Sequence, residues 1–210
     1  IFNARKVATP KRTRATRNTF NMPPATPPPE HLRDEVQSVL IGEAEIAARV
    51  RELAADIERF YSGTDKDLLV VALLTGTVPF LADLVRHIAL PMRLDFMGVS
   101  SYGAGTAPGE LVYTKELRLE ARNRDVLLVD DILDTGQTLR AVIDKLNALQ
   151  PRSLKTCVLL EKTSRRTEAV TADFVGFEVP DEFVIGYGLD YAERYRNLPF
   201  IGVLKPEMYA

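Results

Sequence analysis

Hydrophobic residues along the chain recur in two patterns, one helical and one typical of buried strands. Between Ile41 and Phe60 they recur at steps of three and four, which places them on one face of a helix. These residues are Ile46, Val50, Leu53, Ala54, Ile57 and Phe60. Continuous apolar runs at 67–74, 125–133 and 154–161 are of strand length and rich in β-branched residues. Such runs indicate strands of a parallel sheet that is covered on both faces.

Further elements alternate with these runs. The pattern predicts helices at 78–89 and 137–149 and a strand at 92–99, with shorter strands near 173–177, 183–186 and 200–204. Residues 100–111 contain three glycines, two serines and a proline, which indicates a mobile loop. This order of strands and helices predicts an α/β domain with a mainly parallel sheet flanked by helices.

The amino-terminal part has a different composition. Residues 1–21 contain six basic residues and no acidic one, and 22–30 contain five prolines. Proline lacks an amide donor and fixes its φ angle, so we expect residues 1–33 to be a disordered tail and 34–210 to form the domain. Because Met22 precedes the proline-rich linker, residues 1–21 fit upstream sequence or a misplaced start better than a transit peptide.

Composition excludes several classes of protein. The chain has 210 residues, 46% of them hydrophobic, as in globular proteins. Cys157 is the single cysteine, which excludes an intrachain disulfide and fits a reducing, cytoplasmic setting. No apolar run approaches the ~20 residues that span a bilayer. Without residues 1–21 the chain carries 21 basic and 29 acidic residues, a net charge of −8, which argues against nucleic acid as a partner.

The segment from Val126 to Thr138 carries the most chemical information. A buried strand runs directly into Asp130, Asp131 and Asp134, and Thr135-Gly136-Gln137-Thr138 then opens a helix. Ligands of open α/β sheets bind beyond the carboxyl ends of the strands, and a helix amino terminus binds phosphate. Carboxylates beside a phosphate suit ribose hydroxyls or Mg²⁺. The residues therefore predict a site for a sugar phosphate and a divalent metal.

One other interpretation of this segment stays open, and two further ones do not fit its sequence. In the first, Asp134 or Thr135 only caps a helix and the other acids are solvated. A calcium-binding EF-hand loop does not fit, because the glycine and the acids lie at the wrong offsets. A Walker phosphate loop does not fit either, because the chain contains no GxxxxGK[ST] motif.

The segment VLLVDDILDTGQT resembles the phosphoribosyl-diphosphate (PRPP) signature of the purine and pyrimidine phosphoribosyltransferases. The segments DFMGVSSYGAGT (95–106), DFVGFEVPDEFVIGYGLDYAERYRNLP (173–199) and IGVLKPEMY (201–209) resemble the hypoxanthine(-guanine) members of that family. The resemblance runs from about Val39 to Tyr209 and implies the type I phosphoribosyltransferase fold. It also implies a small hood built from the carboxyl-terminal segment, and a flexible lid loop.

The resemblance implies a role for each residue of the PRPP signature. Asp134 would be the general base that takes a proton from purine N7. Asp130 and Asp131 would hold the ribose hydroxyls, directly or through Mg²⁺, although the family more often has Glu at the first position. The 5′-phosphate would lie on the turn formed by Thr135, Gly136, Gln137 and Thr138.

Other segments supply the rest of the implied site. Lys162 would donate to purine O6, which suits an oxo group and argues against adenine. Phe183 would stack on the purine or else only pack in the core, and the backbone of Val184 would read the purine edge. Asp190 would bind a second Mg²⁺, and the planar guanidinium of Arg196 would contact pyrophosphate.

Two loops complete the implied site. Ser101 and Tyr102 begin the segment that matches the family's lid, whose closure would exclude water from the reactive sugar. Thr75 and Gly76 lie in the segment that matches the pyrophosphate loop, which often contains a cis peptide bond in this family. Thr75 stands where a lysine is common, so we expect the backbone to bind pyrophosphate and weaker binding than in relatives with the lysine.

The implied activity is transfer of phosphoribosyl from PRPP to N9 of hypoxanthine, and also of guanine, with Mg²⁺ as cofactor. The resemblance further implies a homodimer or a homotetramer with small-molecule substrates and no membrane partner. A xanthine-preferring enzyme is one alternative, because base selectivity rests on contacts worth only ~1–3 kcal/mol. An RNA-binding attenuation regulator of the same fold is another, which the acidic domain disfavours.

Overall fold

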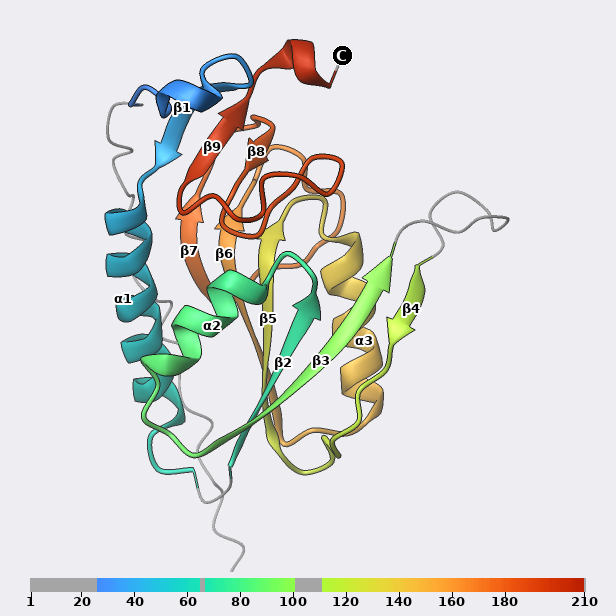
Figure 1. The fold of residues 1–210 in the computed structure, drawn as a ribbon. Helices are drawn as coiled ribbons and strands as arrows, with labels where there is room; N and C mark the ends of the chain where they lie inside the picture. Colours follow the sequence, from blue (N-terminus) through green and yellow to red (C-terminus); the bar gives the residue numbers. More distant parts are fainter. Residues whose placement is uncertain (1–25, 65–66, 101–110, 210) are drawn as a thin grey trace, which may run out of the picture.

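A six-stranded sheet organises the computed structural model, which describes residues 26–64, 67–100 and 111–209 (Figure 1). The strand order is β4-β3-β2-β5-β6-β7, and every neighbouring pair is parallel except β3 with β4. The strands are β2 (Leu68–Leu74), β3 (Met92–Ser100), β4 (Val112–Lys115), β5 (Asp125–Leu133), β6 (Ser153–Glu161) and β7 (Phe174–Glu178). The predicted α/β fold with a mainly parallel sheet is confirmed.

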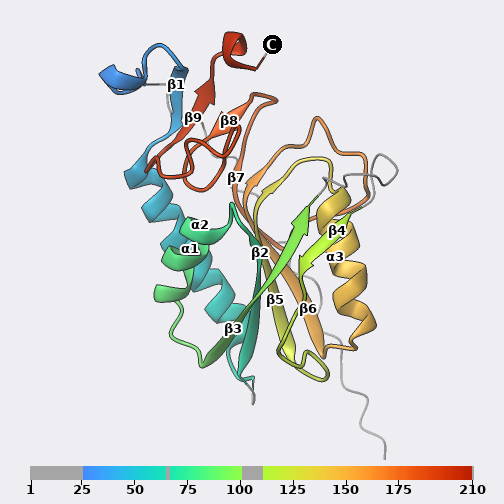
Figure 2. The same cartoon turned by 45° about the vertical axis from the view of Figure 1, so that its right-hand side comes forward.

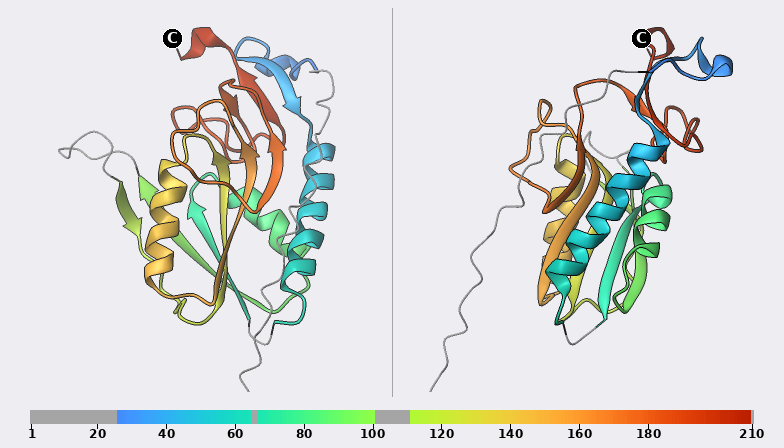
Figure 3. Two further views of the ribbon diagram at one scale, coloured as in Figure 1. Left: turned by 180° about the vertical axis from the view of Figure 1, so that it is seen from behind. Right: turned by 90° about the vertical axis from the view of Figure 1, so that its left-hand side faces the viewer.

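Helices cover both faces of this sheet. Helices α1 (Glu43–Tyr61) and α2 (Val78–Arg86) lie on one face, and α3 (Gln137–Ala148) lies on the other (Figure 3). In β2, Leu68, Val70 and Ala72 belong to the core under α1 and α2. Leu69, Val71 and Leu73 alternate with them and belong to the core under α3. Because neighbouring strand residues point to opposite faces, a doubly covered strand is apolar throughout.

A small antiparallel sheet forms a hood over the carboxyl ends of the large sheet's strands (Figures 1 and 2). Its order is β1-β9-β8, with β1 (Val36–Ile41), β8 (Val184–Ile185) and β9 (Ile201–Leu204). The predicted hood used the carboxyl-terminal segment alone, whereas the structure adds β1 from the amino-terminal part. Val36 of β1 packs with Ile185 and Leu204 in the hood's core. The hood is therefore closed by both ends of the domain.

The hydrophobic pattern did not predict two strands, β1 and β4, and both lie at a sheet edge. In β1 the half-buried residues between Val36 and Ile41 give neither a continuous apolar run nor a strict alternation. In β4 the side chains alternate between exposed and half-buried, and none is fully buried. The hydrophobic pattern is therefore too weak to predict either strand.

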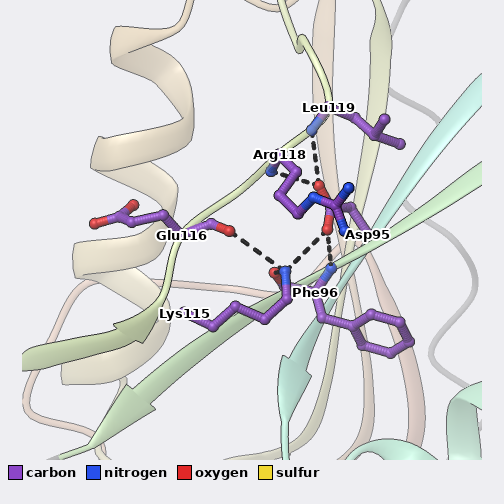
Figure 4. A network of polar contacts seen from close by, with 6 residues as sticks. All are labelled: Asp95, Phe96, Lys115, Glu116, Arg118 and Leu119. Atoms are coloured by element: carbon purple, nitrogen blue, oxygen red, sulfur yellow. Dashed lines mark hydrogen bonds and ion pairs between the residues drawn. The ribbon is translucent and has the colours of Figure 1, made fainter.

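The edge strand β4 and the segment that follows it are tied to the sheet by Asp95 of β3 (Figure 4). The buried carboxylate accepts hydrogen bonds from the amides of Phe96, Arg118 and Leu119 at 2.6–2.8 Å. It also forms a 3.0 Å ion pair with Lys115. Burial by itself raises the pKa of Asp95, but these hydrogen bonds outweigh that effect and lower it to about 2.

The described structure begins at Thr26, inside the segment that we expected to be disordered up to residue 33. Thr26 exchanges two main-chain hydrogen bonds with Val39, and a 3-10 turn, η1 (Glu30–Leu32), places Leu32 against the hood's core. This segment is held by main-chain hydrogen bonds and a single leucine, so its sequence has no hydrophobic periodicity that predicts structure. Residues 1–25, and the lid residues Ser101 and Tyr102, lie outside the described residues. Within the described ranges, no helix is long and apolar enough to cross a membrane.

Candidate active site

A cleft of about 240 Å³ lies at the carboxyl ends of β2 and β5. The hood lies over these strand ends (Figure 2). Parallel pairing of β2 with β5 and of β5 with β6 brings these ends to one edge. The cleft is lined by Leu73, Leu74, Val99, Asp130, Asp131, Ile132, Leu133, Asp134, Thr135, Gly136, Thr138 and Leu139. Six of the predicted site residues therefore surround one cavity.

Gly136 forms the turn between β5 and α3. It is the residue before the first helical position, Gln137, and its φ of 91° is a left-handed angle that favours glycine. A Cβ at Gly136 would lie 3.3 Å from Cδ of Arg166, so a side chain at this position would crowd Arg166. The first amides of a helix have no partner within the helix and attract anions. The turn thus presents the positive end of α3 to the cleft.

Asp130, which is buried, and Asp131, which is half-buried, form an acidic pair at the end of β5. Asp130 accepts hydrogen bonds from the hydroxyl of Thr77 at 3.3 Å and from the amide of Asp131 at 3.0 Å. Burial raises the pKa of both carboxyls, and the Asp131 charge raises the pKa of Asp130 further. Two such carboxylates gain stability from hydroxyl donors or from a cation, which is what a ribose diol with Mg²⁺ supplies.

Asp134 has an oxygen without a hydrogen-bond partner. Its Oδ1 is buried and, among the described residues, no donor reaches it, while Oδ2 lies 3.6 Å from a guanidinium nitrogen of Arg165. A buried acceptor that lacks a donor costs free energy unless a ligand supplies one. The capped-helix interpretation of Asp134 is wrong, because Gly136 precedes α3 and no side chain caps it.

The loop between β2 and α2 meets Asp131 and the hood at two glycines. The peptide bond between Leu74 and Thr75 is cis, and Thr75 is exposed. A Cβ at Gly76 would lie 1.8 Å from Oδ2 of Asp131, and one at Gly188 would lie 1.8 Å from the carbonyl oxygen of Gly76. Gly188 also has a left-handed φ of 105°. Backbone therefore packs on backbone where the loop predicted to bind pyrophosphate meets the hood.

Asp190 and Arg196 lie on the hood loop between β8 and β9 and form an ion pair of 3.0 Å. Arg196 also donates to the carbonyl of Gly188 at 2.9 Å, and the charge of Arg196 lowers the pKa of Asp131 against the effect of burial. Asp190 accepts a second hydrogen bond from the amide of Glu193 at 2.9 Å. The two residues predicted to serve metal and pyrophosphate are thus paired with each other beside Gly76 and Asp131.

The residues predicted to bind the purine lie at the end of β6 and in the hood, and they are not among the residues that line the cleft. Lys162 directly follows β6, is only 5% exposed, and donates from Nζ to the carbonyl oxygen of Glu182 at 2.6 Å. The ring of Phe183 stacks on Tyr209 with centroids 4.7 Å apart and meets Tyr191 edge to face. The stacking contact supports a packing role for Phe183 and leaves its predicted purine contact as a prediction. Val184 is buried in β8.

The acidic residues do not form a closed metal cage. In the described part of the chain, no group of three or more His, Cys, Asp and Glu side chains could hold a metal ion. Mg²⁺ is commonly held by one or two carboxylates together with substrate oxygens and water. The neighbouring carboxyl groups of Asp130 and Asp131 supply the hard oxygen donors that fit such a shared site, and burial raises the pKa of both, which a cation would offset.

Sequence reasoning missed four residues at this site. Thr77 binds Asp130, Glu182 binds Lys162, Arg166 contacts the main chain of Asp134, and Gly188 packs on Gly76. Thr77 lies just before α2, where a threonine predicts a helix cap, but its hydroxyl donates to Asp130 and not to an amide of the helix. The other contacts join segments that are distant in the sequence or depend on main-chain atoms, for which a sequence offers no pattern.

Comparison with known proteins assigns this architecture to a family. Residues 40–192 match the family described as "Phosphoribosyl transferase domain". The chain is 47% identical over 179 residues to a hypoxanthine-guanine phosphoribosyltransferase of Bacillus subtilis, covering 85% of this chain and 98% of that protein. It is 51% identical over 166 residues to a hypoxanthine phosphoribosyltransferase of Haemophilus influenzae, covering 78% and 93% of the two chains.

Solved structures and longer relatives extend the comparison. A crystal structure of a hypoxanthine phosphoribosyltransferase from Staphylococcus aureus superposes with a TM-score of 0.80 at 42% identity, covering 86% of this chain and 97% of that chain. A bifunctional protein TilS/HprT of Listeria innocua is 47% identical over 182 residues, and the match covers 86% of this chain. The chain spans only 28% of that protein's length. The fold, the PRPP signature and the matched family agree, and the chain belongs to the phosphoribosyltransferase family with the type I fold.

Proposed function

We propose that the protein is a Mg²⁺-dependent hypoxanthine phosphoribosyltransferase of purine salvage, which also accepts guanine. The relatives named for this activity support the proposal, since they match most of this chain and nearly all of their own length. The observation that carries it is the buried, unpartnered Oδ1 of Asp134 beside the Gly136 turn. A proton acceptor next to an anion site is what the transfer of a sugar phosphate to a protonated base requires.

In the proposed reaction, N9 of the purine forms a bond to C1′ of the ribose as the bond from C1′ to pyrophosphate breaks. Pyrophosphate leaves with the electron pair, and Asp134 takes the proton from N7. The Gly136 turn, with Thr135, Gln137 and Thr138, binds the 5′-phosphate through amides and hydroxyls. Asp130 and Asp131 accept hydrogen bonds from the ribose hydroxyls.

The remaining residues select the base and hold the leaving group. Lys162, which already donates to a carbonyl oxygen, offers its charge to purine O6, so a 6-amino group would find no acceptor. Val184 reads the purine edge through its backbone, and Phe183 contacts the ring. Gly76, the backbone of Thr75 and Arg196 bind pyrophosphate. Mg²⁺, held by Asp130, Asp131 and Asp190 with substrate oxygens, would neutralise the charge of the leaving group.

A product assay tests the proposal. The protein is incubated with PRPP, Mg²⁺ and one of hypoxanthine, guanine, xanthine or adenine, and the nucleotides are separated by chromatography. We expect IMP and GMP, with little AMP. XMP as the main product would favour the xanthine-preferring alternative, and AMP as the main product would contradict the role of Lys162.

We further propose a cytoplasmic homodimer or homotetramer whose catalytic domain is preceded by a basic tail. The buried free Cys157 is consistent with a reducing compartment. Light scattering measures the oligomeric state, and the activity of a chain that starts at Met22 tests whether the preceding residues are dispensable.

A further inference from the structure

Arg166 connects the ends of strands β5 and β6 through its guanidinium group. Nε donates to the carbonyl of Asp134 at 3.0 Å, and one terminal nitrogen reaches the carbonyls of Leu133 at 3.3 Å and Lys162 at 3.0 Å. The same nitrogen forms a 3.1 Å ion pair with Glu161, and the other donates to the carbonyl of Val170 at 2.6 Å. The side chain is 16% exposed. A single arginine thus binds carbonyl groups at the ends of both β5 and β6.

Two of these carbonyls belong to Asp134 and Lys162, which the proposed reaction places at N7 and O6 on one edge of the purine. Leu133 pairs with Glu161 at the end of the β5–β6 ladder, and the amide of Lys162 donates to Leu133 at 3.0 Å. Asp134 and Lys162 each follow directly. Beyond this last ladder contact the strands end, so the guanidinium supplies the cross-link that the sheet no longer provides.

A separate set of bonds holds the phosphate turn. The amides of Thr167 and Glu168 donate to the carbonyl of Thr135 at 3.0 and 3.1 Å. These are main-chain bonds, so they do not depend on the identity of residue 166. The guanidinium of Arg166 therefore binds Asp134 and Lys162, and its Cδ lies next to Gly136, while the main chain of Thr167 and Glu168 holds the turn before Gly136.

We propose that Arg166 is a positioning residue that sets the spacing between Asp134 and Lys162, and so the fit of purine N7 and O6. This inference rests on the proposed function. The purine is rigid, so a shift of either group by a fraction of an ångström misaligns one of the two contacts. Arginine suits this place because its planar fork can bind several carbonyl oxygens in fixed directions, which the point charge of lysine cannot do.

Kinetics of Arg166→Lys and Arg166→Gln test the proposal, with hypoxanthine and PRPP varied separately. We expect the KM for hypoxanthine to rise about tenfold or more and kcat to fall, with the KM for PRPP changed less than about twofold. Glu161→Gln weakens the one carboxylate partner of Arg166 and should produce the same asymmetry to a smaller degree. If the Arg166 variants do not fold, this variant decides the question.

Arg152→Lys is the matched control, because Arg152 binds Asp125 at the opposite end of β5. It should lower the melting temperature and leave both KM values unchanged. Equal changes of the two KM values in the Arg166 and Glu161 variants, or a loss of stability alone, would overturn the proposal. The wild-type product assay stays separate: absence of IMP there contradicts the proposed function, whereas IMP formation with symmetric variants contradicts only the role of Arg166.

Discussion

Lys162 donates a hydrogen bond of 2.6 Å from its ammonium group to the main-chain carbonyl of Glu182. This bond joins the end of β6 to the segment just before β8, across the boundary between the large sheet and the hood. A lysine that is 5% exposed keeps its charge near a carbonyl and does not extend into solvent. The ammonium group is therefore held by the hood, and the proposed function assigns it to purine O6.

Lys162→Gln should raise the KM for hypoxanthine about 10- to 100-fold, since a hydrogen bond to a charged group contributes about 1.5–3 kcal/mol. The KM for PRPP should stay within about twofold, because Lys162 is assigned no PRPP contact. Steady-state kinetics with each substrate varied measures both. Lys155→Gln, in the same strand and paired with Asp173 at the surface, is the control that should match the wild type. Equal KM values for Lys162→Gln and the wild type would remove Lys162 from base binding.

Asp134→Asn should lower kcat by about 100- to 10,000-fold, the usual contribution of a positioned proton acceptor. An amide is nearly the same size but cannot take the proton from N7, so PRPP should bind with nearly unchanged affinity. Calorimetric titration with PRPP and Mg²⁺ measures the binding. Asp144→Asn, at an exposed ion pair on α3, serves as the control. A kcat close to that of the wild type would show that Asp134 is not the base.

Gly188→Ala should weaken both stability and PRPP binding. The new Cβ would lie 1.8 Å from the carbonyl oxygen of Gly76, which pushes the pyrophosphate loop away from the hood. Gly63→Ala is a matched control, because Gly63 has a similar left-handed φ of 86°, while no atom of the described residues beyond its two chain neighbours lies within 4 Å of an added Cβ. It should show only the backbone cost of about 1–2 kcal/mol. Urea unfolding and PRPP titration of both variants separate the steric effect from the conformational effect. Equal losses of stability and of PRPP affinity in the two variants would contradict the steric effect at Gly188.

Asp95→Asn should lower the free energy of unfolding at pH 7 by about 2 kcal/mol, as expected for a carboxyl whose pKa falls from its ordinary value to about 2 on folding. Because the folded pKa is lowered, the stabilisation is complete well above pH 4 and is lost as the pH falls toward 2. The wild type should therefore lose more stability over this interval than the variant, in urea unfolding at several pH values. Asp67→Asn, at an exposed ion pair with Arg93, should lose less than about 1 kcal/mol.

Removing Mg²⁺ with EDTA should stop product formation without changing the melting temperature of the free protein. The described residues contain no cluster that could hold a metal by itself, so the ion is expected to bind together with PRPP. Thermal unfolding with Mg²⁺ alone, PRPP alone and both together measures this coupling. A large shift with Mg²⁺ alone would contradict a shared site.

The hydrophobic pattern and local motifs were sufficient to predict the parallel sheet and the glycine turn before α3. Strands such as β5, buried on both faces, leave continuous apolar runs, and a glycine between acids and a helix start is a local feature. The run 126–138 therefore carried both the strand and the predicted site residues.

The contacts between the parts of the site could be seen only in the folded structure. The pairing of β1 with β9, the packing of Gly76 on Gly188, and the bonds of Arg166 to three carbonyls near Asp134 all join segments far apart in the chain or use main-chain atoms. Except in proline, every residue has the same main-chain donor and acceptor. The side-chain sequence therefore does not predict which main-chain groups bind each other. Only the folded chain brings a particular carbonyl to a particular donor, and this is why the residues that support the site became visible only in the structure.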